Sequence, residues 1–469
     1  MPKIDHRFIF IYLAGAIAPF TGNLILPMIT NLENDFTTNV SLVLLSFTLF
    51  QIPYAIGQFF SGGISDVYGR RKLITGGILI MIAGLALTPF STSIWFFIAT
   101  RVLQGIGMAL AGPVLVALIG DLTDFSNRSK YMGYYGAAIN AGIALGPLIG
   151  GLMANQWRLL FLALAVFSSS LFVYSLFSLR GIPVKEGGSA GEVVEALRDT
   201  LRYRSVLTLG VIGFFTFFSY IAVLSISSNG LSVFPYYLDP NTIGIILSTS
   251  GFVGVFVSSL AGILTGRLGK RKIPITGFII VGCSLIALAR VTTYSGPAFP
   301  LGYIPNALTI VSQGVSITGE NFLNLQFIQT LFGSIYGGII IQTLFKLIYS
   351  GIFINFLVFM MLLVSGISLV WPSLLSLTVD FVPPERRGTS SSIFNGMRFL
   401  GYAAAPTVYT PLYLSIGLNA VFITGATFIP PIIALVFLVT RTRKKTEKQK
   451  TQKGKKKQKE TLKVNQKTK

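Results

Sequence analysis

The sequence has very few residues of the kinds that build redox and metal sites. It contains one cysteine, Cys283, and one histidine, His6, in 469 residues. One cysteine cannot form an intramolecular disulfide, and one histidine excludes a zinc site built on several histidines. We therefore expect neither a cofactor nor a bound metal.

Charge is scarce as well. Charged residues make up 11% of the chain and hydrophobic residues 52%, and the mean hydropathy is +0.71. A soluble domain of this size needs more polar surface to face water. The composition therefore predicts a protein surrounded by lipid.

Long apolar runs are what the sequence does have. Runs of about 20 residues, each able to cross roughly 30 Å of hydrocarbon as a helix, recur along the chain. The first, from Phe8 to Thr30, is longer than the apolar part of a signal peptide, so we expect it to be retained. We predict an all-α polytopic membrane protein with spans at residues 8–30, 42–64, 73–91, 95–120, 131–154, 158–179, 206–235, 241–265, 273–293, 354–379, 389–413 and 418–440.

Basic residues gather in alternate connections between these spans. Such connections stay in the cytoplasm, so both termini are predicted to be cytoplasmic in a multi-pass protein of the plasma membrane. The basic groups are Arg70 to Lys72, Arg128 with Lys130, Arg180 to Arg204, Arg267 to Lys272, Arg386 with Arg387, and the lysine-rich tail.

The net charge of +21 comes largely from the tail, because 14 of the 37 basic residues lie between Arg441 and Lys469. This segment, 441–469, has no apolar period, and we expect it to be disordered. Attraction to anionic membrane lipid, at about 1 kcal/mol per basic residue, is the favoured interpretation. Nucleic acid is the alternative partner, and we do not expect it.

The chain contains an internal repeat. The glycines and basic residues of Gly62 to Lys72 recur 200 positions later in Gly262 to Lys272, although Gly266 stands where the first copy has Asp66. We infer parallel six-helix halves, 1–180 and 205–440, joined by a cytoplasmic linker, 181–204, with a binding site near mid-membrane between them. Further on, the offset is 259 for Gly107 and Gly366, Pro113 and Pro372, Asp121 and Asp380, Arg128 and Arg387, Gly142 and Gly401, and Pro147 and Pro406.

The change of offset locates an extracellular insertion at about residues 295–352. The segment Phe327 to Tyr349 is apolar enough to enter the membrane. Because the basic groups after it must stay cytoplasmic, the insertion must add an even number of crossings. An extracellular cap or interfacial helix is favoured over two added spans.

The segment from Gly62 to Lys72 resembles the signature G-x-x-x-D-x-x-G-R-[RK]-[RK] of the major facilitator superfamily. The resemblance implies two six-helix bundles related by a pseudo-two-fold axis along the membrane normal. It also implies that Asp66 faces the N-terminus of the eleventh helix, at residues 388–390, and closes the cytoplasmic side, with Arg70 or Arg128 as charge partner. A topology anchor without gating is the alternative. The residues assigned to gating and coupling are Asp66, Gly69, Arg70, Arg71 and Arg128.

Two further segments resemble motifs of that family, and a third, Trp157 to Phe161, resembles its drug/proton antiporter branch. Arg101 to Gly105 is similar to R-x-x-Q-G, and Gly142 to Gly151 is similar to G-x-x-x-G-P-x-x-G-G, which is associated with exporters. The glycines also serve helix packing, and the proline permits a bend. The residues assigned to a hinge are Gly142, Gly146, Pro147, Gly150 and Gly151.

Ionisable residues within the spans are few, and each is a functional candidate. Arg398 lies about 16 Å along a helix from Arg387, near the midplane. A structural role beside backbone carbonyls or Tyr402 is its alternative. Two arginines without a deep carboxylate favour anionic or neutral substrates. The residues assigned to the substrate cavity are Arg101, Gln104, Asn23, Tyr54, Asn140, Tyr220 and Arg398.

We predict a secondary active transporter, monomeric, that exports small organic molecules by alternating access. The resemblance implies coupling to protons, and with no acid deep in the spans Asp66 is the first candidate for the coupling residue. Uptake or exchange of a metabolite or organic anion is one alternative, and a non-transporting sensor or scaffold is another. An enzyme is not expected, because no nucleophile, base and orienting acid occur together at membrane depth.

Overall fold

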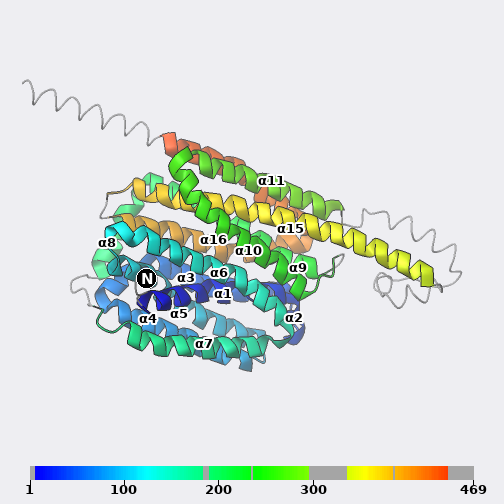
Figure 1. Cartoon of the computed structure of the whole chain (residues 1–469), viewed down its shortest axis with the longest axis horizontal. Helices are drawn as coiled ribbons and strands as arrows, with labels where there is room; N and C mark the ends of the chain where they lie inside the picture. Colours follow the sequence, from blue (N-terminus) through cyan, green and yellow to red (C-terminus); the bar gives the residue numbers. More distant parts are fainter. Residues whose placement is uncertain (1–5, 183–189, 234–235, 295–334, 384–385, 442–469) are drawn as a thin grey trace, which may run out of the picture.

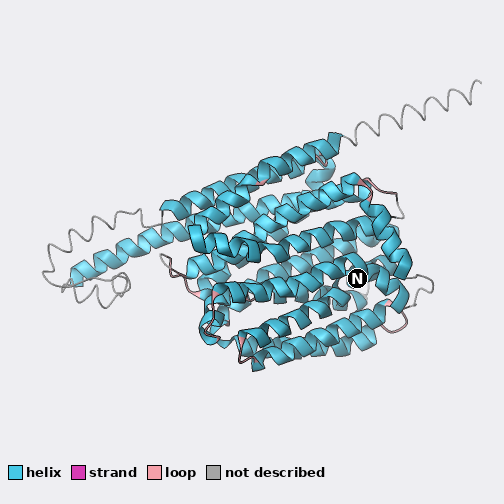
Figure 2. Ribbon diagram, turned by 180° about the vertical axis from the view of Figure 1, so that it is seen from behind, coloured by secondary structure: helices cyan, strands magenta, loops and turns pink. Residues whose placement is uncertain are grey.

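The computed structural model describes residues 6–182, 190–233, 236–294, 335–383 and 386–441. Within these ranges every regular element is a helix (Figure 2). The longer ones are α1 (His6–Asn23), α3 (Val40–Tyr68), α4 (Arg70–Leu87), α5 (Ile94–Leu122), α6 (Phe125–Leu152), α7 (Trp157–Ser178), α9 (Arg204–Ser232), α10 (Pro240–Leu268), α11 (Lys272–Tyr294), α15 (Ile335–Asp380) and α16 (Arg387–Ile416). The shorter ones are η1 (Leu26–Met28), α2 (Ile29–Asp35), η2 (Thr88–Phe90), η3 (Ala154–Gln156), α8 (Ala190–Leu201) and α17 (Leu418–Thr427).

Eleven helical segments in the described ranges are long and apolar enough to cross a membrane. The first joins α1, η1 and α2 as His6–Asp35, and the last extends α17 to Arg441. The predicted span 389–413 corresponds to α16, which is 30 residues long but not among the eleven. Polar residues such as Asn395 and Arg398 lower its hydropathy, and α16 keeps them from lipid by packing between α3 and α9.

The long helices lie side by side with their axes roughly aligned, so the bundle has two ends (Figure 1). One end carries α8 and the start of α1, and we call it the α8 end. The opposite end carries α2, and we call it the α2 end.

Helix α15 extends past the bundle at the α2 end (Figure 1). Its 46 residues correspond to about 69 Å, far more than a bilayer core. Residues 335–352 of the predicted insertion are thus helical and continuous with the tenth span, which was predicted to begin only at 354. Residues 295–334 lie outside the described residues, so the choice between a cap and added spans remains open.

Helix crossings recur at the positions that the repeat relates. A Cβ atom built on Gly77 of α4 would lie 2.5 Å from the carbonyl oxygen of Gly107 in α5. One built on Gly277 of α11 would lie 2.7 Å from the carbonyl oxygen of Gly366 in α15. Only glycine permits backbones to approach this closely.

The turn after α3 also recurs after α10. Gly69 has φ 88° and Gly269 has φ 98°, values at which a side chain would be strained. The two N–H groups donate to the carbonyls of Ser65 and Thr265, at 3.0 and 3.1 Å. The same tight turn is therefore present in both copies of the repeat.

Two long helix pairs join the predicted halves, α3 with α16 and α6 with α10. Shorter contacts add α2 and η1 against α9. The binding site predicted between the halves therefore falls among the side chains of these helix pairs.

Candidate functional site

Arg398 of α16 lies among aromatic rings from three helices. Its guanidinium carbon is 4.3 Å from the ring centroid of Phe399, 4.9 Å from that of Trp371 in α15 and 5.1 Å from that of Phe217 in α9. Contacts of this length are favourable cation–π interactions. Aromatic faces therefore hold the charge of Arg398.

Further rings extend this group across the interface between the halves. The ring of Tyr54 in α3 lies 4.7 Å from that of Phe399. The ring of Tyr402 lies 5.5 Å from that of Phe217 and 6.4 Å from that of Tyr220. The name aromatic cluster is used below for Tyr54, Phe217, Tyr220, Trp371, Phe399 and Tyr402.

Polar atoms beside the cluster lack hydrogen-bond partners. They are Nε of Arg398, Nε1 of Trp371 and Oδ1 of Asn395, which lies one helical turn before Arg398. Across the described ranges, neither a hydrogen bond nor an ion pair links Arg398 to another residue. A buried polar group without a partner costs about 1–3 kcal/mol, so this arrangement suits a ligand that brings partners of its own.

Arg101 of α5 is situated quite differently. It is 0% exposed, and its Nη1 donates to Oε1 of Gln104 at 2.7 Å while Nη2 donates to the carbonyl of Thr21 at 3.1 Å. That carbonyl belongs to the last turn of α1, where helical carbonyls lose their intrahelical partners. Gln104 in turn donates to Oγ1 of Thr88 at 2.8 Å. Arg101 and Gln104 therefore tie α1, η2 and α5 together in this conformation.

The two asparagines predicted to line the cavity, Asn23 and Asn140, form their hydrogen bonds away from Arg101 and Arg398. Asn23 donates to a carbonyl one turn earlier in its own helix, at 2.7 Å. Asn140 of α6 lies 3.4 Å from Oγ of Ser258 in α10, so it contributes to the contact between the halves. The structure thus gathers only part of the predicted set, namely Tyr54, Tyr220 and Arg398.

Arg70 and Arg71 lie at the α8 end. Arg70 forms an ion pair with Asp121 of α5 and also donates to Oγ of Ser65 at 2.7 Å. Arg71 reaches the carbonyl of Leu176 in α7, at 3.4 Å. The side chains of Asp66 and Arg128 lie outside the described residues, so their predicted contacts stay predictions. In the second copy, Lys270 and Asp380 form the matching ion pair at 2.5 Å.

The glycine motif of α6 packs against α1 and α10. A Cβ on Gly146 would lie 2.7 Å from the carbonyl oxygen of Phe20 in α1. Gly142 faces Ala16 one turn earlier, and Gly150 faces Leu24 just after the end of α1. Gly151 faces Pro240 of α10 instead, and the carbonyl of Pro147 meets Gly244. The motif therefore packs α6 on both sides, and its role as a hinge stays a prediction.

The two ends of the bundle carry separate contacts between the halves. At the α2 end, Oγ1 of Thr30 lies 2.7 Å from Oγ of Ser232, and Asn229 donates to Glu33 at 3.1 Å. At the α8 end, Phe59 of α3 packs closely against Gly396 of α16. Both ends are held closed by side chains that lie outside the aromatic cluster.

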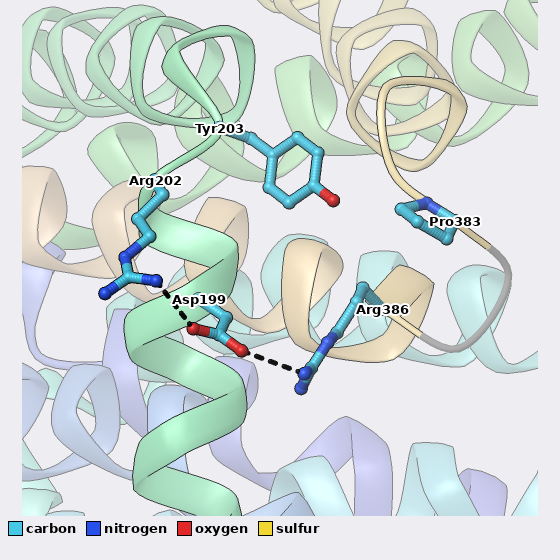
Figure 3. Close-up of a pocket in the computed structure, with 5 residues that line it drawn as sticks. All are labelled: Asp199, Arg202, Tyr203, Pro383 and Arg386. Atoms are coloured by element: carbon cyan, nitrogen blue, oxygen red, sulfur yellow. Dashed lines mark hydrogen bonds and ion pairs between the residues drawn. The ribbon is translucent and has the colours of Figure 1, made fainter.

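Helix α8 adds a polar contact that the sequence did not predict (Figure 3). Asp199 accepts a hydrogen bond from Arg202 at 3.4 Å and from Arg386 at 3.1 Å. With Tyr203 and Pro383 these residues line a cavity of about 470 Å³. The apolar face of α8 packs on α3 and α16.

Sequence reasoning missed Trp371, Phe399 and Asn395 as members of the site. A usable signal was present, because Asn395, Arg398 and Tyr402 follow one another at helical spacing on one face. Nothing comparable marks Trp371, which stands on another helix in an apolar run.

Several known proteins are similar to this chain in sequence. The chain is 27% identical to multidrug resistance protein 2 of Bacillus subtilis (strain 168) over 392 residues, covering 78% of this chain and 96% of that protein. It is 25% identical to the bacillibactin exporter of the same organism over 440 residues, covering 92% and 94%. It is 26% identical to the class H tetracycline resistance protein of Pasteurella multocida over 297 residues, covering 61% and 74%.

The family profile gives the broadest match. The profile of the Major Facilitator Superfamily matches residues 11–337 and 328–468, which together cover most of the chain. The resemblance inferred from the motifs is confirmed. The chain belongs to the Major Facilitator Superfamily.

Proposed function

We propose that this protein is a secondary transporter that exports small organic molecules from the cell. The observation that carries the proposal is the aromatic cluster around Arg398, which bridges α3 and α16 in the interior of the bundle. The names of the similar proteins, a multidrug resistance protein and a bacillibactin exporter, support export.

Alternating access requires each end of the bundle to open in turn. We place the α8 end in the cytoplasm, because it carries the basic residues Arg70 and Arg71. Loading then requires α3 and α16 to part at Phe59 and Gly396. Release requires the hydrogen bonds of Thr30 with Ser232 and of Asn229 with Glu33 to break.

Closed contacts at both ends fit an occluded intermediate. The bonds at the α2 end are few and mostly between neutral groups, each worth about 0.5–1.5 kcal/mol. Such contacts open at small cost, as a transport cycle needs. The plasma membrane, the cytoplasmic termini and the monomeric state remain parts of this proposal.

Coupling to protons is the further part of the proposal. The acidic side chain that joins the two halves at the α2 end is Glu33, through Asn229. Asp66 remains the candidate that the family resemblance supplies. Dissipating a proton gradient should stop export if protons drive it.

Everted membrane vesicles test the function. Vesicles that contain the protein should accumulate an organic substrate when energised, and right-side-out vesicles should not. Accumulation in right-side-out vesicles instead would favour uptake of a metabolite. No flux in either orientation for cationic, neutral and anionic probes would favour a sensor or scaffold.

A further inference from the structure

We propose that Arg398 and the aromatic cluster form a binding site for an organic anion, specifically an aromatic ring that carries a carboxylate. The inference rests on the proposed transport function and names the substrate class of its central site. It is carried by the contacts of Arg398, which differ from those of Arg101, the other arginine predicted to line the cavity.

The first step is charge. A guanidinium stays protonated, so Arg398 keeps its positive charge inside the bundle. The acids that pair with bases in the described ranges lie toward the ends of the bundle, as Asp121 does with Arg70, and Asp380 with Lys270. The charge of Arg398 is therefore left for an anion that comes from solution.

The second step is hydrogen bonding. Arg398 offers a planar fork of N–H donors, which matches the two oxygens of a carboxylate. The indole N–H of Trp371 is also buried without a partner, on the ring that lies 4.9 Å from the guanidinium. These unpartnered donors lie on two neighbouring helices, α15 and α16.

The third step is access. Arg398 and Phe399 are both half-buried, in contrast to Arg101, which has no exposed surface. Tyr54 is half-buried on the opposing helix α3. Parting of α3 from α16 would open the contact between Tyr54 and Phe399 and bring a ligand to Arg398.

The fourth step is the ring. Phe217, Trp371 and Phe399 come from three helices and present their faces to one cation. Tyr54 of α3 extends this aromatic surface through its contact with Phe399. Aromatic ligands gain from offset or edge-to-face contacts with such faces. A cationic ligand of the same shape would be repelled by Arg398, and a neutral one would gain no ion pair.

The test uses three probes that share one ring, 2-naphthoate, 2-naphthamide and 2-naphthylmethylammonium. Binding to the purified full-length protein in lipid nanodiscs is measured by equilibrium dialysis, with empty nanodiscs to subtract partition into lipid. The proposal predicts roughly tenfold tighter binding of the carboxylate than of the amide, and the weakest binding for the ammonium.

Variants locate the binding. Arg398→Gln should weaken 2-naphthoate about tenfold and leave 2-naphthamide within about twofold. Arg398→Lys should fall between, because an ammonium keeps the charge but loses the fork. Arg158→Gln is the matched control, since Arg158 also lies over a tryptophan ring, 4.2 Å from Trp157, but is exposed at the protein surface.

The outcomes separate this inference from the proposed function. Tighter binding of the ammonium, or 2-naphthoate binding unchanged in Arg398→Gln, would overturn the anion site even if export is observed. Binding that depends on Arg398 without any export would uphold the site and overturn the function. If Arg398→Gln does not fold, the order of the three probes on the unmodified protein and on Arg398→Lys decides.

Discussion

The bundle holds two arginines with opposite surroundings. Arg101 is fully buried and donates to Gln104 and to the carbonyl of Thr21, so its charge is used within the protein. Arg398 is half-buried among Phe399, Trp371 and Phe217 and donates to no described residue. The same residue type therefore stabilises one part of the bundle and remains available for a ligand in another.

The difference follows from the neighbouring helices. Helix α1 ends at Asn23, and its last turn offers a carbonyl to which Arg101 donates, while α9, α15 and α16 continue past Arg398 as helices. Beside these helices Arg398 contacts aromatic faces in place of hydrogen-bond acceptors.

Removing Arg101 should have the largest effect on stability. Arg101→Ala leaves Oε1 of Gln104 and the Thr21 carbonyl without their donor and opens a cavity, which should lower the free energy of unfolding by about 3 kcal/mol. Thermal unfolding of the purified protein measures this loss. A change below about 1 kcal/mol would mean that the hydrogen-bonded network is not structural.

Removing Arg398 should affect transport far more than stability. Arg398→Gln should reduce flux of an aromatic carboxylate about tenfold, while unfolding changes by less than about 1 kcal/mol because only cation–π contacts are lost. Flux and thermal unfolding are measured on the same preparation. Equal losses of stability in Arg398→Gln and Arg101→Ala would erase the contrast between the two arginines.

Removing one hydrogen-bond partner of Arg101 should leave its guanidinium partly unpaired, as that of Arg398 is. Gln104→Leu leaves Nη1 of Arg101 without its acceptor, which should cost about 1–2 kcal/mol of stability. Adding Arg101→Leu on top should cost less than Arg101→Leu alone, which a double-mutant cycle detects. Strictly additive losses would argue against coupling of the two side chains.

A half-exposed arginine at the α8 end should show the smallest effect. Asp199→Asn removes the ion pair with Arg386, which should cost about 0.5 kcal/mol because solvent screens such a pair. Arg386→Gln should cost a similar amount in thermal unfolding. A loss above about 2 kcal/mol in either variant would place α8 among the main structural contacts.

Much of the fold could be predicted from the sequence, because lipid imposes length and hydropathy on each span. The repeat placed Gly69 and Gly269 at matching positions, and both glycines adopt a positive φ there. The length of α15 could not be predicted, since the apolar character of residues 335–352 is compatible with a cap, with added spans and with an extended helix.

The site was predicted only in part. Arg398 and Tyr54 could be named because polar and aromatic residues within spans are conspicuous. Their contact through Phe399 depends on how α3 meets α16, which no local pattern encodes. The sequence also placed Arg101 and Arg398 in one cavity, because the bonds that distinguish them come from other helices.

The most direct test of the account is flux in everted vesicles that contain the unmodified protein. The account predicts accumulation of 2-naphthoate inside these vesicles, above that in vesicles without the protein and above that of 2-naphthylmethylammonium. Accumulation in right-side-out vesicles instead, or no accumulation of any probe in either orientation, would contradict it.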